Sequence, residues 1–525
     1  MTPEDWIAHD PDPVTAAELA GCDRAELAAR FARPLTFGTA GLRGPVRGGP
    51  DAMNLAVVLR ATWAVAKVLT GRGLAGSAVL VGRDARHGSA AFATAAAEVL
   101  AAERFSVILF PRPVPTPVLA FAVRRTGAAA GIQITASHNP PTDNGYKVYM
   151  DGGMQIVPPT DHEIEAAIAD APFADEIDRA PIEPAEDGLV ELYIQRAARV
   201  RRSSGQVRVA LTPLHGVGGA VALETLRRAG FDDVHTVASQ FNPDPDFPTV
   251  RFPNPEEPGA TDALLQLAVE AHAEIAIALD PDADRCAVGI PTPTGWRMLS
   301  GDETGWLLGN FLLSCTEPGE RATSVVASTV VSSRMLSAIA AHWGARHVET
   351  LTGFKWLARA DADLPDSTLI YAYEEAIGHC VDPAAVRDKD GISAAVLACD
   401  LVATLKRSDR SVHDALDDLA RRFGVHVGAA VSRPVSDADE AAALMRRLRA
   451  SPPTKLAGFD SSTTDLMDRT DALVFTGGEA DTSARVVVRP SGTEPKVKFY
   501  IEVRSATRRR AAALCDDLAS AVGRW

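Results

Sequence analysis

Short apolar segments alternate with longer helical segments along most of the chain. Seven runs rich in aliphatic residues have the length of buried strands: 78–81, 107–110, 131–134, 207–211, 275–279, 325–328 and 369–372. Between them lie Ala- and Leu-rich stretches with helical periodicity: 54–69, 90–102, 220–229, 262–271 and 332–343. Since strands that alternate with helices form βαβ units, this order predicts an α/β fold with parallel or mixed sheets.

The chain of 525 residues has the length of three or four domains of about 100–200 residues each. Three breaks interrupt the alternation: a proline-rich stretch within 155–205, the sequence TEPGER at 316–321, and residues 424–434. After the last break, segments 473–475, 484–488 and 496–503 have the pattern of antiparallel strands, and 505–522 that of an amphipathic helix. The C-terminal part is therefore expected to be a smaller α+β domain.

Charge and cysteine content exclude several classes of protein. The formal net charge of −15 argues against a surface that binds nucleic acid or an anionic membrane. The six cysteines are scattered without a CxxC pair, which argues against a zinc site or a disulfide framework and fits a reducing cytosol. The first residues are acidic and proline-rich, unlike a signal peptide, and no apolar stretch has the length of a membrane span. These features predict a cytoplasmic, globular protein.

A small polar loop directly follows the predicted strand 131–134. It runs from Ile134 to Lys147 and places Ser137 at the carboxyl end of the strand, where ligands bind in open α/β sheets. Ser137 could simply begin a turn, but with His138 beside it and Lys147 close behind it could also be a nucleophile. No GxSxG sequence surrounds it, which argues against acyl transfer.

Three aspartates follow the predicted strand 275–279. Asp280, Asp282 and Asp284 stand at alternate positions, and holding three carboxylates together without a cation is costly. Carboxylate oxygens suit Mg²⁺, whereas Arg285 and Pro291 occupy positions that an EF-hand gives to glycine and glutamate. A solvated Asp-Pro turn is the alternative to this predicted metal site.

Two further loops carry groups that suit a phosphorylated ligand. In the C-terminal part, residues 489–498 combine Arg489 with two hydroxyls and a glycine, a donor set that can hold a phosphate, although an ordinary hairpin is the alternative. After strand 369–372, Glu374 could bind sugar hydroxyls and His379 could act as an acid or base, although acids at a helix start are the simpler explanation of this sequence when it is taken alone. Glycine-rich loops add one cation each, Arg43 and Lys355.

Together these loops resemble those of the α-D-phosphohexomutase superfamily, the phosphoglucomutases and phosphomannomutases, over essentially the whole chain. The matching sequences are FGTAGLRG at 37–44, TASHNP at 135–140, DPDADR at 280–285, EEAIG at 374–378 and RPSGTEPK at 489–496. The resemblance implies three related α/β domains with mixed sheets and a smaller C-terminal α+β domain around a central cleft. With the breaks above, the expected boundaries are 1–205 with the phosphoserine loop, 206–317 with the metal loop, 318–427 with the sugar loop and 428–525 with the phosphate loop.

The resemblance also implies a mechanism that interconverts a sugar 1-phosphate and a sugar 6-phosphate. Ser137 would carry the phosphoryl group and, with Asp280, Asp282 and Asp284, hold Mg²⁺. Phosphate would pass from Ser137 to the sugar, and the bisphosphorylated intermediate would return its other phosphate, so a sugar 1,6-bisphosphate is the expected activator. The other residues implied as catalytic are Arg43, His138, Lys147 (a candidate proton carrier) and His379. Those implied as substrate-binding are Arg285, Lys355, Glu374, Ala376, Arg489, Ser491, Gly492, Thr493 and Lys498.

One departure from the sequence pattern of the superfamily leaves the identity of the sugar substrate open. Ala376 stands where many members of the superfamily have serine, and EEAIG, with TPLHGVG at 212–218 and TGFKW at 352–356, is more similar to the branch with phosphopentomutase and bisphosphate-synthase members. Glucose or mannose phosphate is the expected substrate, with glucose 1-phosphate first, and a pentose phosphate or a bisphosphate-synthase activity is the alternative. We expect a monomer or weak dimer whose partner is a phosphorylated monosaccharide, not nucleic acid or a membrane.

Two other classes of function fit less well. A haloacid-dehalogenase-type phosphatase would use Asp280 as its nucleophile, but Asp284 stands where that motif needs Thr or Val, and Ser137 and Arg489 would have no role. A non-catalytic sugar-phosphate-binding protein would be expected to lack Ser137 or a metal carboxylate, and the sequence has both.

Overall fold

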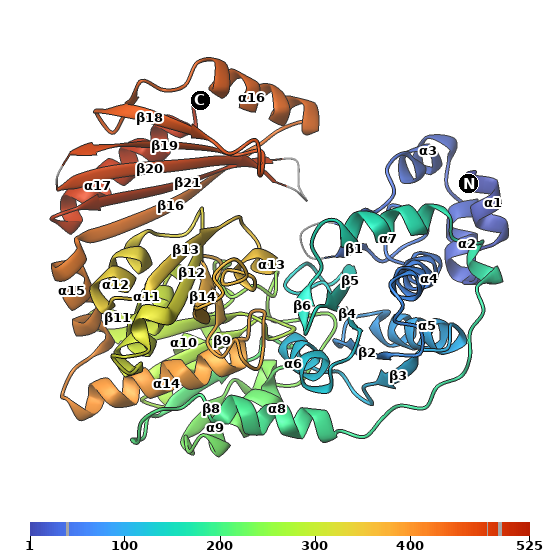
Figure 1. Cartoon of the computed structure of the whole chain (residues 1–525), viewed down its shortest axis with the longest axis horizontal. Coiled ribbons are helices and arrows are strands. Elements are labelled where there is room, and N and C mark those ends of the chain that lie inside the picture. The colour runs from blue at the N-terminus through green and yellow to red at the C-terminus, as the bar shows by residue number, and fades with distance from the viewer. Residues whose placement is uncertain (38–40, 480, 492–495) are drawn as a thin grey trace. The chain divides into compact units, whose positions relative to one another are not determined.

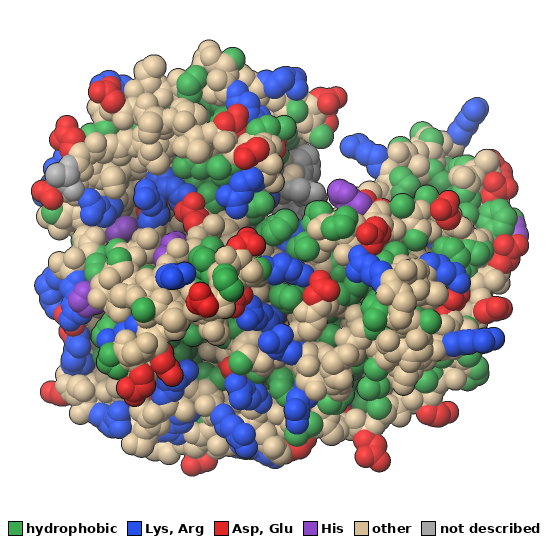
Figure 2. Space-filling view, in the orientation of Figure 1, with side chains coloured by type: hydrophobic (Ala, Val, Ile, Leu, Met, Phe, Trp, Pro, Cys, Tyr) green, Lys and Arg blue, Asp and Glu red, His purple; other side chains and the backbone are tan. Residues whose placement is uncertain are grey.

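The computed structural model describes residues 1–37, 41–479, 481–491 and 496–525 (Figure 1). Its chain forms two compact units, one of residues 1–304 with 370–408 and the other of residues 305–369 with 409–525. Within the described ranges, no helix combines the length and the apolar composition needed to cross a membrane. On the face shown in Figure 2, Lys and Arg side chains are interspersed with Asp and Glu.

The first sheet of the first unit has the strand order β1-β5-β4-β2-β3, with β6 paired to β5. Its strands are β1 (Leu42–Pro45), β2 (Ala78–Arg83), β3 (Ser106–Leu109), β4 (Ala130–Ile134), β5 (Asp143–Met150) and β6 (Met154–Gln155). Strand β2 is parallel to β3 and β4, whereas β5 is antiparallel to β4, β1 and β6. The sheet is therefore mixed, and the β4–β5 turn lies at the carboxyl end of β4.

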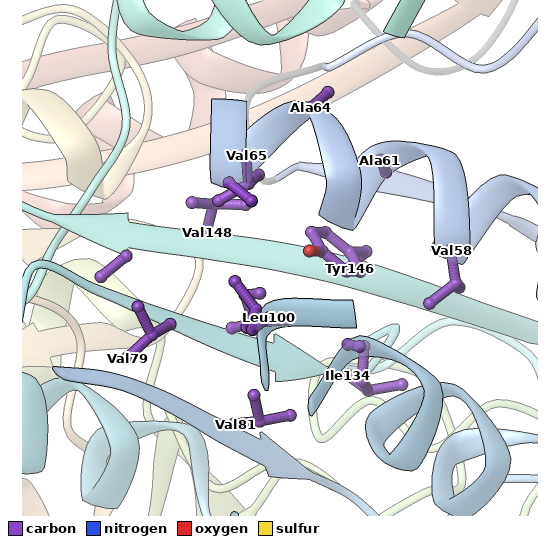
Figure 3. Close-up of a cluster of buried hydrophobic side chains, with 14 of the residues drawn as sticks. Val58, Ala61, Ala64, Val65, Val79, Val81, Leu100, Ile134, Tyr146 and Val148 are labelled. Atoms are coloured by element: carbon purple, nitrogen blue, oxygen red, sulfur yellow. The ribbon is translucent and has the colours of Figure 1, made fainter. Parts of the chain in front are cut away.

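Helices cover both faces of this sheet. They are α4 (Leu55–Gly71), α5 (Ser89–Ala102), α6 (Thr116–Thr126) and α7 (Thr160–Ala169), and α1 (Pro3–Ala8), α2 (Pro13–Ala20) and α3 (Arg24–Ala32) precede them. Asn54 begins α4 by accepting a hydrogen bond from the amide of Val57. Figure 3 shows α4 side chains such as Val58 and Val65 packed towards strand residues such as Val79 and Val148, which excludes water from this face. A Cβ on Gly131 would meet side chains of α6, so α6 covers the opposite face.

The second sheet of this unit has the order β11-β10-β9-β7-β8. Its strands are β7 (Val209–Thr212), β8 (Val234–Thr236), β9 (Ile275–Leu279), β10 (Cys286–Thr292) and β11 (Gly295–Met298). Strand β7 is parallel to β8 and β9, and β10 is antiparallel to β9 and β11. The helices around it are α8 (Gly188–Ala198), α9 (Gly219–Arg228), α10 (Asp262–Glu270) and α14 (Gly391–Arg407). The antiparallel pair β14 (Thr368–Glu374) and β15 (Gly378–Cys380) leads into α14.

The second unit combines a parallel strand pair with an antiparallel sheet. The pair is β12 (Ser324–Thr329) and β13 (Arg346–Thr350), and its helices are α11 (Gly301–Cys315), α12 (Met335–Trp343), α13 (Phe354–Leu357) and α15 (Val412–Phe423). The antiparallel sheet has the order β16-β21-β20-β19-β18-β17. Its strands are β16 (Val425–Pro434), β17 (Lys455–Leu456), β18 (Phe459–Asp465), β19 (Leu473–Glu479), β20 (Thr482–Pro490) and β21 (Lys496–Ser505).

Two helices, α16 (Ala438–Ala450) and α17 (Arg508–Val522), pack on the antiparallel sheet and share its apolar core. The predicted α/β class is confirmed, with mixed sheets and a C-terminal α+β segment whose sheet is antiparallel throughout.

Candidate active site

Ser137 lies in the turn between β4 and β5, and its side chain points to Asp280 in the predicted metal loop. Its φ is 53°, in the left-handed region that costs a non-glycine residue about 1 kcal/mol. The Ser137 amide donates to Oγ1 of Thr135 at 3.0 Å. Its hydroxyl donates to Oδ2 of Asp280 at 2.9 Å and lies 3.1 Å from Nδ1 of His138. The predicted nucleophile is therefore in direct contact with Asp280, one of the three aspartates predicted to bind the metal.

The three aspartates after β9 form one buried cluster. Asp280, Asp282 and Asp284 are each 0% exposed, and one carboxylate oxygen from each lies within 4.8 Å of the others. Between them, Ala283 has a φ of 55°, which turns the chain so that alternate side chains converge. Oδ1 of Asp282 and Oδ1 of Asp284 are buried without a hydrogen-bond partner among the described residues. Buried carboxylate oxygens with free lone pairs fit a hard divalent cation such as Mg²⁺.

Two lysines partly compensate the charge of this cluster. Nζ of Lys147 lies 2.8 Å from Oδ2 of Asp282 and 3.1 Å from Oδ2 of Asp284. Nζ of Lys389, which follows β15, lies 3.3 Å from the same oxygen of Asp284. Both lysines are buried, so neither charge is screened by solvent.

The electrostatic environment shifts the pKa values of Asp280 and Asp282 in opposite directions. Burial, together with the charges of Asp282 and Asp284, raises the pKa of Asp280 well above its usual range. Burial also acts to raise the pKa of Asp282, but the attraction and hydrogen bond of Lys147, together with hydrogen bonds to Thr116 and Asp280, outweigh it and hold that pKa below its usual range. Burial acts to lower the pKa of Lys147, and the two neighbouring aspartates reverse the effect and raise it. Lys147 is therefore charged at neutral pH, and Asp280 is the carboxylate that gains most from a bound cation.

Arg285 connects the metal loop to the predicted sugar loop. Its Nη1 donates to the carbonyl oxygen of Ala376 at 2.9 Å, and its Nη2 lies 3.7 Å from Glu374. Burial raises the pKa of Glu374, which is 8% exposed. A Cβ on Gly301 would lie 1.9 Å from the carbonyl oxygen of Glu375, so only glycine fits behind this loop. The carbonyl of Ala376 is thus held in place, while its methyl group offers no hydrogen bond.

Arg43 and His138 lie beside the Ser137 loop. Nη1 of Arg43, on β1, donates to Oδ1 of Asn139 at 3.0 Å. Burial, aided by the charges of Arg285 and Arg43, lowers the pKa of His138 well below its ordinary value, so its imidazole is neutral at pH 7. The catalytic roles of Arg43 and His138 remain predictions.

His379 is fully buried within the first unit and has no contact with solvent. It is 0% exposed, its ring stacks with those of Tyr371 and Tyr373, and its Nδ1 lies 3.1 Å from the Tyr371 hydroxyl. Burial lowers the pKa of His379 to about 3, so the imidazole is neutral over the physiological range. Its role in proton transfer remains a prediction.

The neutral state of His379 predicts a loss of stability in mild acid. Since its folded pKa of about 3 lies below the unfolded value of about 6.5, its contribution is complete above pH 6.5 and is lost as the pH falls towards 3. Between pH 6 and 4 this residue should cost about 1.4 kcal/mol of unfolding free energy per pH unit. Urea unfolding at several pH values should show a shallower pH dependence for His379→Phe than for the wild type. The exposed His413→Gln should behave as the wild type, and equal slopes in all three proteins would contradict the assignment.

The remaining predicted residues belong to the second unit. Lys355 is buried on α13, and Arg489 on β20 pairs in register with Lys498 on β21. The Ser491 amide donates to the carbonyl oxygen of Lys496 at 2.8 Å, which closes the start of the predicted phosphate loop. Gly492 and Thr493 lie outside the described residues. The substrate-binding roles of all six remain predictions.

Sequence reasoning missed two side chains that contact the aspartates. Lys389 lies between Asp388 and Asp390, directly before α14, and this cation between two acids was the available signal. Thr116, at the start of α6, donates to Oδ2 of Asp282 at 2.6 Å. Its sequence, in a proline-rich turn, gives no sign of this contact because the two residues are 166 positions apart.

Comparison with known families gives matches to four domain descriptions in order along the chain. Phosphoglucomutase/phosphomannomutase alpha/beta/alpha domain I matches residues 34–175, domain II matches 191–293, domain III matches 300–423, and the C-terminal domain matches 436–521. Among solved structures, a phosphoglucomutase/phosphomannomutase family protein of Burkholderia thailandensis has a TM-score of 0.72 at 22% identity, over 92% of this chain and 96% of that one. The open form of pp63/parafusin from Paramecium has a TM-score of 0.72 at 19% identity, over 93% and 94%. These structures support the fold.

Relatives match over most of the sequence. The Haemophilus influenzae protein named "Probable phosphomannomutase" is 41% identical over 467 residues, 86% of this chain and 93% of that protein. The Mus musculus protein named "Phosphopentomutase" is 33% identical, over 95% of this chain and 89% of that protein. The Homo sapiens protein named "Glucose 1,6-bisphosphate synthase" is 30% identical, over 98% and 91%. With all four domains matched in order, the chain belongs to the phosphoglucomutase/phosphomannomutase family of the α-D-phosphohexomutase superfamily and is a phosphomutase, an enzyme of the isomerase type.

Proposed function

We propose that this enzyme interconverts a sugar 1-phosphate and a sugar 6-phosphate through phosphorylated Ser137 and a bisphosphorylated sugar. The observation that carries the proposal is the 2.9 Å contact between the Ser137 hydroxyl and Asp280, within a buried cluster of three carboxylates. Phosphoryl transfer depends mainly on positioning and charge neutralisation, and this cluster supplies both next to a hydroxyl nucleophile.

The chain's own residues account for the proton and charge balance. Asp280, Asp282 and Asp284 would hold Mg²⁺, which when bound neutralises charge on the transferred phosphoryl group. In the first transfer the bond from phosphorus to the Ser137 oxygen breaks and a bond to a sugar oxygen forms. Lys147, protonated because of its raised pKa, is the candidate donor to the departing serine oxygen, and the proton of the attacking sugar hydroxyl then returns to Lys147. The second transfer reverses these steps with the other phosphate.

Glucose or mannose phosphate is the proposed substrate, with a sugar 1,6-bisphosphate as activator. The relative named phosphomannomutase supports a hexose. A pentose phosphate is the alternative, supported by the relatives named phosphopentomutase and by the methyl group of Ala376, which offers the sugar no hydroxyl donor. The bisphosphate synthase among the relatives supports net formation of the bisphosphate as a variant of the same chemistry. A cytoplasmic location and a monomeric or weakly dimeric state remain predictions from the sequence.

A substrate panel tests the proposal. The purified enzyme with Mg²⁺ and a catalytic amount of the matching bisphosphate is given glucose 1-phosphate, mannose 1-phosphate or ribose 1-phosphate, and product formation is followed by ³¹P NMR. We expect kcat/KM for glucose 1-phosphate to be the highest of the three. A higher value for ribose 1-phosphate would favour the pentomutase alternative, and no interconversion of any of the three would contradict the proposed function.

A further inference from the structure

One side chain, Arg86, contacts the main chain of the Ser137 loop at four points. Its Nη2 donates to the carbonyl oxygens of Ser137 at 2.7 Å and Asn139 at 2.6 Å. Its Nη1 donates to those of Pro140 at 2.6 Å and Asp143 at 3.1 Å. We infer that Arg86 is the positioning residue of the phosphoserine loop, an inference that rests on the proposed function in taking Ser137 as the nucleophile.

The Ser137 loop needs such support because its geometry is strained and its position matters. Ser137 has a φ of 53°, and a loop that holds a non-glycine residue there must be fixed by its surroundings. The contacts of Arg86 span the loop between β4 and β5, from the carbonyl oxygen of Ser137 to that of Asp143. A guanidinium group suits this task because its donors form a rigid planar fork, which a lysine ammonium cannot reproduce.

Arg86 is itself held from two sides. Asp84 lies 3.3 Å from its Nε and also accepts a hydrogen bond from its main-chain amide at 2.9 Å, while the Ser89 hydroxyl donates to the same carboxylate at 2.5 Å. The Phe247 ring lies 5.0 Å from its Cζ atom, within the range of a cation–π contact. Asp84, Arg86 and Phe247 are 1%, 4% and 3% exposed, so solvent does not compete for these contacts.

Phe247 extends this support to the metal loop. It lines a cavity of about 10 Å³ together with Arg86, Gly216 and Pro281, the residue between the first two aspartates. The Val217 amide donates to the carbonyl oxygen of Pro281 at 2.8 Å, and a Cβ on Gly216 would lie 2.3 Å from the Cα of Pro281. Arg86 therefore lies at the point where the backs of the nucleophile loop and the metal loop meet. Its substitution should move the Ser137 oxygen relative to the aspartates without removing any group that touches substrate.

A matched control exists elsewhere in the first unit. Arg201 donates to the carbonyl oxygens of Ser203, Gly205 and Ala229, and its Cζ lies 4.1 Å from the centre of the Phe231 ring. It has the same chemistry as Arg86, an arginine that binds carbonyl groups and stacks on phenylalanine, but it holds the connection between α8 and β7. Arg201→Lys thus measures the general cost of removing such an arginine.

The test compares Arg86→Lys with Arg201→Lys. In a single turnover with glucose 1,6-bisphosphate and Mg²⁺, Arg86→Lys should slow the transfer of phosphate to Ser137 by about 100-fold, since a misplaced nucleophile loses reactivity steeply. KM for the sugar phosphate should change little, because Arg86 is placed to touch the loop and not the ligand. In Arg201→Lys the rate of phosphate transfer to Ser137 should be within about twofold of the wild-type rate, even if the thermal midpoint falls as much as in Arg86→Lys. Transfer by Arg86→Lys within twofold of the wild type, or equal slowing in both variants, would overturn the inference.

Hydrogen–deuterium exchange separates this inference from the proposed function. In Arg86→Lys the amides of residues 137–143 should exchange faster than in the wild type and in Arg201→Lys. If the wild type takes up no phosphate at Ser137, the proposed function fails, and unchanged exchange at 137–143 would then overturn the positioning role as well.

If Arg86→Lys does not fold, Phe247→Leu is the milder variant, which keeps the four carbonyl contacts and should slow the transfer of phosphate to Ser137 by about 5-fold. Wild-type transfer and wild-type exchange in Phe247→Leu would then count against the inference.

Discussion

Replacing Ser137 with alanine should reduce kcat by at least about 10⁴-fold, because removal of a nucleophile removes the covalent intermediate. The fold should persist: alanine has the same Cβ as serine, so the strain at a φ of 53° is unchanged, and the substitution removes only the hydrogen bonds of one hydroxyl. A hydrogen bond of this kind contributes about 1 kcal/mol to stability. The measurements are the steady-state rate with glucose 1-phosphate and the thermal unfolding midpoint.

Ser462→Ala is the control for this experiment. Ser462 is an exposed serine on β18 whose hydroxyl lies 2.8 Å from that of Thr476, in the second unit. This variant should keep the wild-type rate. A Ser137→Ala enzyme with more than about one-tenth of wild-type activity would contradict a phosphoserine mechanism.

Replacing Asp282 with asparagine should reduce kcat by about 10²–10³-fold and abolish stabilisation by magnesium. The amide has nearly the shape of the carboxylate, but it carries no charge, so the site loses one anionic metal ligand and Lys147 loses its 2.8 Å ion pair. Activity should be measured over a range of Mg²⁺ concentrations. Binding should be measured separately as the rise in thermal midpoint on adding Mg²⁺, which a bound ligand produces in the absence of turnover.

The matched control is Asp400→Asn. Asp400 is also 0% exposed and accepts hydrogen bonds, including one from the amide of Arg202 at 2.7 Å, but it lies on α14 away from the three aspartates in sequence. The Asp400→Asn variant should be less stable than the wild type, but its thermal midpoint should still rise when Mg²⁺ is added. The metal assignment is wrong if Asp282→Asn responds to Mg²⁺ as the wild type does, or is fully active after metal is removed with a chelator.

Much of the fold could be predicted because local pattern and burial agree. The apolar run 275–279 coincides with β9, and helix 54–69 is realised as α4, since both are buried over most of their length and their periodicity is not disturbed. Strand β5 was missed because it begins Asp-Asn-Gly, a sequence typical of a turn, and its strand conformation depends on pairing with β4 and β1. Helices α1 to α3 at the N-terminus were also missed, as they are short and interrupted by prolines and acids.

The candidate site was predicted in its loops but not in its contacts. Strand ends with polar turns identified Ser137 and the aspartates, because a serine in a polar turn directly after a strand and clustered carboxylates are unusual enough to be recognised in a sequence. The sequence did not show that Ser137 is buried, at 3% exposed, because this depends on the packing of loops that are distant in the chain. Lys389 and Arg86 could not be assigned in the same way. Each acts on a loop far away in the chain, and which distant carboxylate or carbonyl a lysine or arginine meets is decided by tertiary packing.

The mass of the Ser137 peptide tests the central claim most directly. The pure enzyme is incubated with Mg²⁺ and either glucose 1,6-bisphosphate or ribose 1,5-bisphosphate, then digested and analysed by mass spectrometry under conditions that preserve phosphoserine. The account predicts one added phosphate on Ser137 with at least one of the two bisphosphates, and none on that peptide in Ser137→Ala. An unmodified Ser137 in an enzyme that interconverts sugar phosphates, or phosphate on Asp280 instead, would contradict it.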